Sequence, residues 1–138
     1  MSLSAIPRAL RDKIFARDMG HCQYCLLNQV GQASIFHINH VIPRSKGGLT
    51  IELNLALQCP SCSLRKSDKT SAIDPQGGDE VPLFHPVNNR WDDHFWIDSQ
   101  GQCHGKTASG RATIDALAMN EPLPRIARAL QIRLGLIR

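Results

Sequence analysis

The stretch FHINHVIPRSKGG, residues 36–48, places two histidines, His37 and His40, in a short apolar run that ends in a basic turn. The apolar residues predict a strand over residues 34–42, and Pro43 with the Gly-Gly pair predicts the loop that ends it. Histidines on a strand that leads into a cationic loop indicate chemistry on an anionic group. Asn39, directly before His40, offers only a neutral oxygen where a metal-assisted site would use a carboxylate or an imidazole.

Two C-x-x-C pairs flank this stretch, Cys22 with Cys25 and Cys59 with Cys62. A two-residue gap lets both thiolates of a pair bind one ion, so the two pairs predict a tetrahedral, structural zinc site with no position open for water. The N-terminus shows no secretory signal, which disfavours disulfides, and a thioredoxin-like redox motif would need a single pair. Cys103 is left over and is expected to be incidental.

The segments around the cysteines predict an α+β protein. A helix is expected over residues 6–18 with Ser4 as its cap, and the alternation in residues 53–58 predicts a second extended segment that runs into Cys59. A helix with a basic face follows Cys62, so the unit is a β-hairpin and a helix pinned at its base by zinc. Turn-forming residues 73–82 end it. We expect a core at residues 6–72 and a C-terminal extension at residues 73–138 that packs on it in one compact domain.

The extension contains an aromatic segment and two predicted helices. The aromatic side chains are expected to cover the zinc unit, with stacking on nucleic-acid bases as the alternative; they are Phe84, Trp91, Phe95 and Trp96. A capped helix is expected from about Ser109. The final helix is amphipathic, with an apolar side that could pack on its own domain or on a second copy, so monomer and dimer both stay open. That side holds Ile126, Leu130, Leu134 and Ile137, and arginines occupy the other.

The net charge and the hydropathy of the chain limit the classes of protein to which it can belong. The 138 residues carry a net charge of +4, and no run approaches the length of a membrane span, so a cytoplasmic location is expected. The basic side chains concentrate in the middle of the chain, where they could bind phosphates without reading base sequence. This basic set consists of Arg44, Lys46, Arg65, Lys66 and Lys69.

The residues CQYC, then FHINHVIPRSKGGLTIELNLALQCPSCSLRK, resemble an HNH endonuclease module of the zinc-knuckled, ββα-metal type, over about residues 8–70. The part after residue 80 is similar to the extension of one bacterial subgroup. The resemblance implies that His40 is the general base and that Asn54 fixes the loop or the His40 ring. It also implies one catalytic divalent ion (magnesium, manganese or zinc) and double-stranded DNA as the partner. A neutral imidazole suits such a base near neutral pH.

Two positions depart from the family pattern. Asn39 and Ser63 stand where the catalytic ion is normally held, and both offer only neutral, weak donors. His37, two residues before Asn39, points to the same face of a strand and is a further candidate site residue. The sequence therefore leaves three functions open. They are a metal-dependent endonuclease, a zinc-stabilised nucleic-acid-binding module that has lost catalysis, and a zinc–thiolate interaction module.

Overall fold

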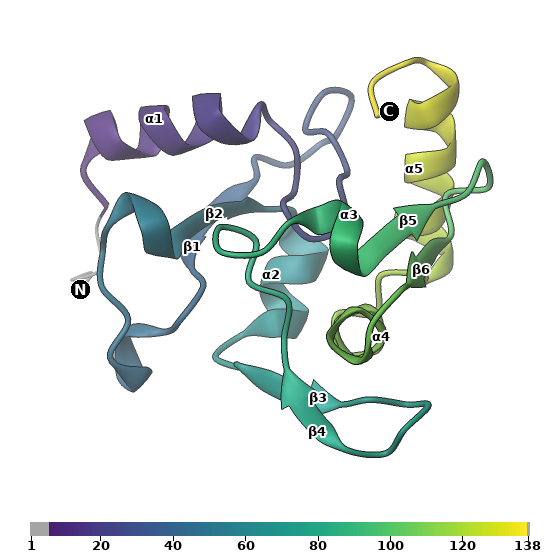
Figure 1. Cartoon of the computed structure of the whole chain (residues 1–138). Coiled ribbons are helices and arrows are strands. Elements are labelled where there is room, and N and C mark those ends of the chain that lie inside the picture. Colours follow the sequence, from purple (N-terminus) through teal and green to yellow (C-terminus); the bar gives the residue numbers. More distant parts are fainter. Residues whose placement is uncertain (1–5, 138) are drawn as a thin grey trace.

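The computed structural model describes residues 6–137 and shows an α+β protein, as expected (Figure 1). It has three small antiparallel sheets, two of which lie in residues 71–105, where no strand was predicted. The first part contains α1 (Arg8–Asp18), β1 (His37–His40), η1 (Arg44–Lys46), η2 (Glu52–Asn54), β2 (Leu55–Gln58) and α2 (Pro60–Lys66). The second part contains β3 (Ser71–Ile73), β4 (Glu80–Pro82), α3 (Trp91–His94), β5 (Phe95–Ile97), β6 (Cys103–Gly105), α4 (Ala108–Ala116) and α5 (Pro122–Arg133).

The predicted hairpin is the pair β1 and β2, with His37 opposite Gln58 and His40 opposite Leu55. Both strands are shorter than the sequence pattern indicated. The first extends only over His37–His40, and a 3₁₀ turn occupies residues 52–54 before β2 begins. Every residue of β2 is buried, so the alternation of leucines does not mark an exposed face there. The hairpin leads directly into α2, which gives the expected β-β-α order.

Helix α1 lies along the hairpin and is bonded to it by its last turn (Figure 1). The buried carboxylate of Asp18 accepts a hydrogen bond from the Leu57 amide at 2.9 Å, and Arg17 donates to the Leu55 carbonyl at 2.6 Å. Met19 in the left-handed conformation and Gly20 end the helix. The predicted cap, Ser4, lies outside the described residues.

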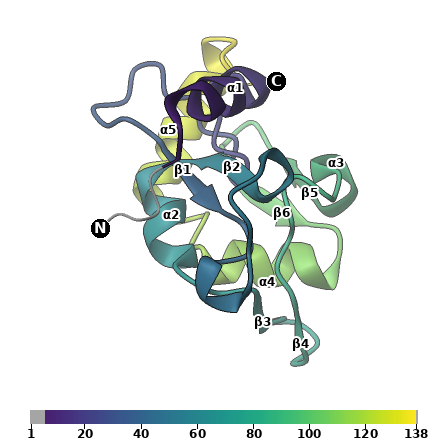
Figure 2. The ribbon, with the colours of Figure 1, turned by 90° about the vertical axis from the view of Figure 1, so that its left-hand side faces the viewer.

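One hydrophobic core joins the two parts of the chain. Phe84 and Phe95 are buried in the same cluster as the four paired cysteines, and Trp91 packs against it. The rings of Phe84 and Phe95 meet edge to face, and their centroids are 5.0 Å apart. Trp96 differs from the expectation because it is half exposed and stacks on His104 instead. Figure 2 shows α4 on the side of the molecule away from α1.

The apolar side chains of α5 are largely exposed, so of the two packings left open by the sequence they do not adopt the one on their own domain. Leu130 and Leu134 are 53% and 75% exposed, whereas Arg128 has no exposed surface and Gln131 is also buried. The Gln131 side chain bonds to the backbone of Asn28, so a polar contact helps to dock this helix. Ile137, which the 3.6-residue period placed with these side chains, lies after α5 and is buried, and periodicity alone does not show which face of a helix is turned inward.

Candidate functional site

The four paired cysteines converge at the base of the hairpin. Their Sγ atoms all lie within 4.8 Å of one another and all four side chains are buried. In each pair the second cysteine's amide donates to the first sulfur, from Cys25 to Cys22 at 3.5 Å and from Cys62 to Cys59 at 3.4 Å. Four convergent thiols form a donor set that fits a closed, tetrahedral zinc site. Cys103 is buried in the same core but is not part of this group.

His40 ends β1, and its ring is held by a residue that the sequence patterns missed. Its Nε2 lies 2.8 Å from Oγ1 of Thr50, in the loop between the strands. When Nε2 carries the proton and donates it to this hydroxyl, Nδ1 has a lone pair available for a proton from water. Burial, and then the nearby charge of Arg44, lower the pKa of His40 below its ordinary value. Both effects favour the neutral imidazole that a general base requires.

Asn54 closes the loop between the strands. Its Oδ1 accepts from the Ile42 amide at 2.9 Å, and its Nδ2 donates to the carbonyls of Ile42 at 3.0 Å and Leu49 at 2.9 Å. Gly48 permits this closure, since a Cβ at that position would lie 1.7 Å from the Ile42 carbonyl oxygen. Asn54 therefore contacts the loop, and no hydrogen bond among the described residues joins it to the His40 ring.

We expect Asn54→Ala to lower the free energy of unfolding by roughly 2–4 kcal/mol, because three hydrogen bonds are lost and loop groups are left unpaired. Denaturant unfolding of the zinc-loaded protein measures this change. Asn89→Ala, at an exposed position where the side chain accepts one bond from the His85 amide, is the matched control and is expected to cost much less. Equal losses for the two variants would contradict this role of Asn54.

Asn39 and Ser63, the two departures from the family pattern, are in direct contact. Nδ2 of Asn39 lies 2.5 Å from Oγ of Ser63 and 3.5 Å from Oε1 of Gln58. Gln58 is almost completely buried, and its Nε2 has no partner among the described residues. The structure thus brings both positions together, as the resemblance implied. The result is a chain of neutral amide and hydroxyl groups in which Asn39 acts as a donor.

His37 is exposed on β1, opposite Gln58 in the register. It shares a strand face with Asn39, as expected from their spacing. No hydrogen bond or ion pair of the described chain engages its ring, so its place in the site stays a prediction.

The basic residues do not all lie on the surface. Arg44 and Lys46 are exposed on η1, and Arg65 and Lys69 are exposed at and after the end of α2. Lys66 corrects the expectation of a basic outer face, because it is only 2% exposed and its Nζ donates to the Val41 carbonyl at 2.8 Å. Burial, and then the charge of Lys46, lower the pKa of Lys66 to about 8. Its ammonium group thus ties α2 to the residue that follows His40.

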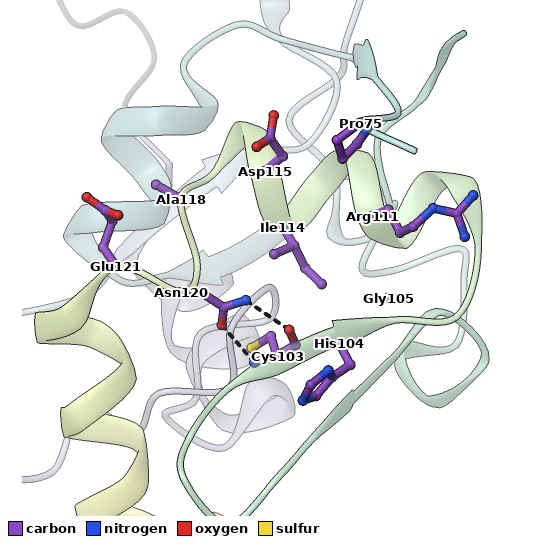
Figure 3. Close-up of a pocket in the computed structure, with 10 residues that line it drawn as sticks. All are labelled: Pro75, Cys103, His104, Gly105, Arg111, Ile114, Asp115, Ala118, Asn120 and Glu121. Atoms are coloured by element: carbon purple, nitrogen blue, oxygen red, sulfur yellow. Dashed lines mark hydrogen bonds between the residues drawn. The ribbon is translucent and has the colours of Figure 1, made fainter. Parts of the chain in front are cut away.

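A cavity of about 510 Å³ lies elsewhere, in the second part of the chain between β6 and α4 (Figure 3). Asn120 forms one of its walls, where its side chain bonds to both the amide and the carbonyl of Cys103. Asp115 and Glu121 provide carboxylates at its lining. None of the predicted site residues lines this cavity, so it is separate from the β1–β2 hairpin and from the four paired cysteines.

A hairpin and a helix meet at four convergent cysteines that can hold a zinc ion, and a histidine ends the first strand. Residues 22–69 match the family model described as HNH endonuclease, and this part of the chain is therefore an HNH domain. The match begins at the first paired cysteine and ends shortly after α2. No match was found among curated proteins or among solved structures. Within residues 6–137, no helix is both long and apolar enough to cross a membrane.

Proposed function

We propose that this protein is an endonuclease that hydrolyses phosphodiester bonds of double-stranded DNA with His40 as the general base. The observation that carries the proposal is the His40 ring, held by Thr50 beside a basic loop, with a pKa lowered by burial and then by the charge of Arg44. Nδ1 of His40 takes a proton from the attacking water, and Thr50 holds the ring and its tautomer through Nε2. Asn54 acts by positioning, because it fixes the loop that carries Thr50 relative to the end of β1.

Exposed cations around the hairpin supply the contacts to DNA in this proposal. Arg44 and Lys46 are on the loop after His40, and Arg65 and Lys69 are at the end of α2. Such side chains bind phosphates without reading the base sequence, and their contribution weakens with salt. Lys66 is left out of this contact surface because it is buried. Its ammonium group instead holds α2 against the backbone after His40.

The residues at the expected catalytic-metal positions fit a divalent ion poorly. Asn39 and Ser63 offer neutral oxygens only, whereas magnesium and manganese prefer carboxylates. Among the described residues, the cysteines form the only cluster of three or more His, Cys, Asp or Glu side chains suited to a metal. A catalytic magnesium, manganese or zinc ion would therefore depend largely on the phosphate itself for its ligands.

The contact between Asn39 and Ser63 favours a second candidate function. Their 2.5 Å hydrogen bond joins Nδ2 of Asn39 to the Ser63 hydroxyl oxygen, which is the atom of Ser63 that an ion would use. A domain with this arrangement could retain the fold and the basic surface and bind nucleic acid without cutting it. This alternative is a catalytically impaired, zinc-stabilised nucleic-acid-binding module. It predicts that the protein binds DNA in a salt-dependent way and yields no cleaved DNA.

Restoring the family residues separates the two functions. We expect Asn39→Glu with Ser63→Asn to increase plasmid nicking by at least 10-fold in magnesium or manganese, because a charged oxygen then binds the ion. Supercoiled plasmid is incubated with the wild-type and the double variant across magnesium, manganese, nickel and zinc. Nicking by the wild-type protein supports the endonuclease.

Nicking by the double variant alone supports the binding module, which a salt-dependent gel shift of the wild-type protein would corroborate. Absence of DNA affinity at low salt would overturn both candidate functions. Asn39→Gln with Ser63→Thr is the matched control, since it changes the same two side chains without adding charge.

A further inference from the structure

Helix α5 turns a row of apolar side chains toward solvent, outside the HNH match at residues 22–69. Leu123 is 83% exposed, Ile126 is 46% exposed, and Leu130 and Leu134 are also exposed. These residues are three or four positions apart, so they form one continuous stripe along the helix. Soluble monomers seldom expose a contiguous apolar surface of this kind unless it binds a partner.

Polar contacts on the opposite side of α5 hold the stripe outward. Arg128 is completely buried, and it donates to the carbonyls of Gly101 at 2.9 Å and Met119 at 2.6 Å. Gln131 is also buried, and its Oε1 accepts from the Asn28 amide at 2.7 Å. Turning the leucines inward would break these hydrogen bonds and leave buried groups unpaired. The fold therefore fixes the exposure of the stripe.

The apolar surface continues onto the loop before β1. Val30 and Ile35 are exposed there, and Nε2 of Gln131 donates to the Val30 carbonyl at 3.2 Å, so this loop lies beside α5 (Figure 2). A groove of about 300 Å³ separates α5 from residues 32–36. Its apolar lining includes Leu27, Phe36, Leu123, Pro124 and Ala127. We refer to the four stripe residues together with Val30 and Ile35 as the α5 patch.

The α5 patch is large enough for a stable contact between two protein chains. A standard interface takes roughly 800 Å² from each partner, and a little over half of that area is apolar. The six aliphatic side chains of the patch are each 46–83% exposed, so together they offer on the order of several hundred Å² of apolar surface. This area is what one side of such an interface requires.

The stripe matches itself when a second copy of α5 lies antiparallel to the first. A twofold axis beside Arg128, midway along the stripe, places Leu123 opposite Leu134 of the second copy. The same axis places Ile126 opposite Leu130 of the second copy. Leu134 of the second copy then meets the groove beside Leu123, so every stripe residue has an apolar neighbour.

The charges at the two ends of α5 favour the same arrangement. Glu121 is the N-cap and Arg133 lies in the last turn; both are exposed, and neither joins an ion pair within residues 6–137. The antiparallel arrangement brings Arg133 within one turn of Glu121 of the second copy. A parallel arrangement would instead bring like charges together, which disfavours association.

We propose that the α5 patch is the contact between two copies of this chain, which pack antiparallel across a twofold axis at the middle of α5. The protein is then a symmetric dimer with one HNH domain in each copy. A second copy is favoured over an unrelated partner because the patch is complementary to itself, both in the order of its apolar residues and in the charges at its ends.

The first test measures the mass of the zinc-loaded, nucleic-acid-free full chain by light scattering during gel filtration. At about 10–100 μM, where interfaces of standard size are normally occupied, we expect twice the mass of one chain. Leu130→Lys places a charge at the centre of the interface in both copies, so it should weaken dimerisation by about 100-fold or more and give a single-chain mass. Leu134→Lys should act in the same direction.

Ile73→Lys is the matched control for Leu130→Lys. Ile73 is also 53% exposed, and on β3 it pairs with Glu80, so a lysine is tolerated there. This variant should stay dimeric. Circular dichroism and zinc content equal to those of the wild-type protein establish that each variant is folded. A single-chain mass for the wild-type protein would overturn the proposal and leave the patch to a different partner, and a dimeric Leu130→Lys protein would overturn it as well.

A charge swap tests the antiparallel orientation. Glu121→Lys and Arg133→Glu should each raise the dimer dissociation constant by about 3–10-fold at low salt, because each introduces like charges at both ends of the interface. The double variant restores opposite charges, so its dissociation constant should return to within about 2-fold of the wild-type value. Analytical ultracentrifugation measures all three. Additive weakening in the double variant would contradict the antiparallel contact.

Discussion

Replacing His40 with alanine is expected to abolish plasmid nicking, with a fall in rate of about 10²–10⁴-fold. Proton removal by a positioned side chain typically contributes a factor of this size. His40 is the histidine at the end of β1, and Thr50 holds its ring at 2.8 Å. Gel electrophoresis of supercoiled plasmid, under the metal conditions in which the wild-type protein is active, measures the change.

His104→Ala is the matched control for this substitution. His104 is in the second part of the chain, where it pairs with Asp98 and stacks on Trp96. Its removal should leave nicking unchanged. Persistence of full activity in His40→Ala would show that another group acts as the base, or that the activity belongs to a contaminant.

The pH dependence of nicking follows from the state of His40. A general base acts in its neutral form, so the rate rises as pH increases through the pKa of the ring and then becomes constant. Burial, followed by the charge of Arg44, lowers this pKa from its ordinary value of about 6.5. Nicking should therefore be constant around pH 7 and fall only in acid below the ordinary histidine range. A midpoint above that range would contradict the assignment.

Removal of zinc is expected to abolish cooperative folding of the described chain. Apparent binding energies of structural zinc sites, about 10–16 kcal/mol, match or exceed the 5–15 kcal/mol stability of a typical domain. The four cysteines are also part of the main hydrophobic core, so their separation would expose Phe84 and Phe95. Circular dichroism with a strong chelator, together with zinc analysis at one ion per chain, tests this expectation.

Cys59→Ser and Cys103→Ser form a matched pair for the same test. Both cysteines are buried, but only Cys59 belongs to the group that can hold a metal. Cys59→Ser should lose zinc and unfold. Cys103→Ser should retain zinc and lose only about 1–2 kcal/mol, because it places a hydroxyl in an apolar site. A native spectrum in metal-free protein would contradict a structural role for the cluster.

Much of the HNH unit could be predicted from local patterns. Two C-x-x-C pairs define a ligand set by spacing alone, because both thiolates of a pair lie within one turn of chain. The run His37–His40 and the following Gly-Gly turn likewise indicate a strand and its end from neighbouring residues. The structure confirms the α+β class, the hairpin and the convergence of the cysteines. The roles of His40, Asn54 and His37 in catalysis remain predictions.

The contacts that position the site could not be predicted in the same way. Thr50 contacts His40 from a loop whose Leu49 carbonyl accepts a hydrogen bond from Asn54, and Lys66 reaches the Val41 carbonyl from 25 residues away. The sequence predicts that a basic residue on a helix is exposed, because most basic residues on helices are exposed. Whether its amine faces solvent or a backbone carbonyl depends on packing between elements.

By itself, the sequence determined the four cysteines that form a possible zinc site, the order of strand, loop, strand and helix, and the histidine at the end of the first strand. These features depend on residue chemistry and on spacing over a few positions. Only the tertiary structure decided that Asn39 and Ser63 bond to each other, that Lys66 is buried, and that α5 turns Arg128 inward. A charged side chain can be buried only where segments from distant parts of the chain supply its partners. The local sequence pattern does not show which distant segments come together.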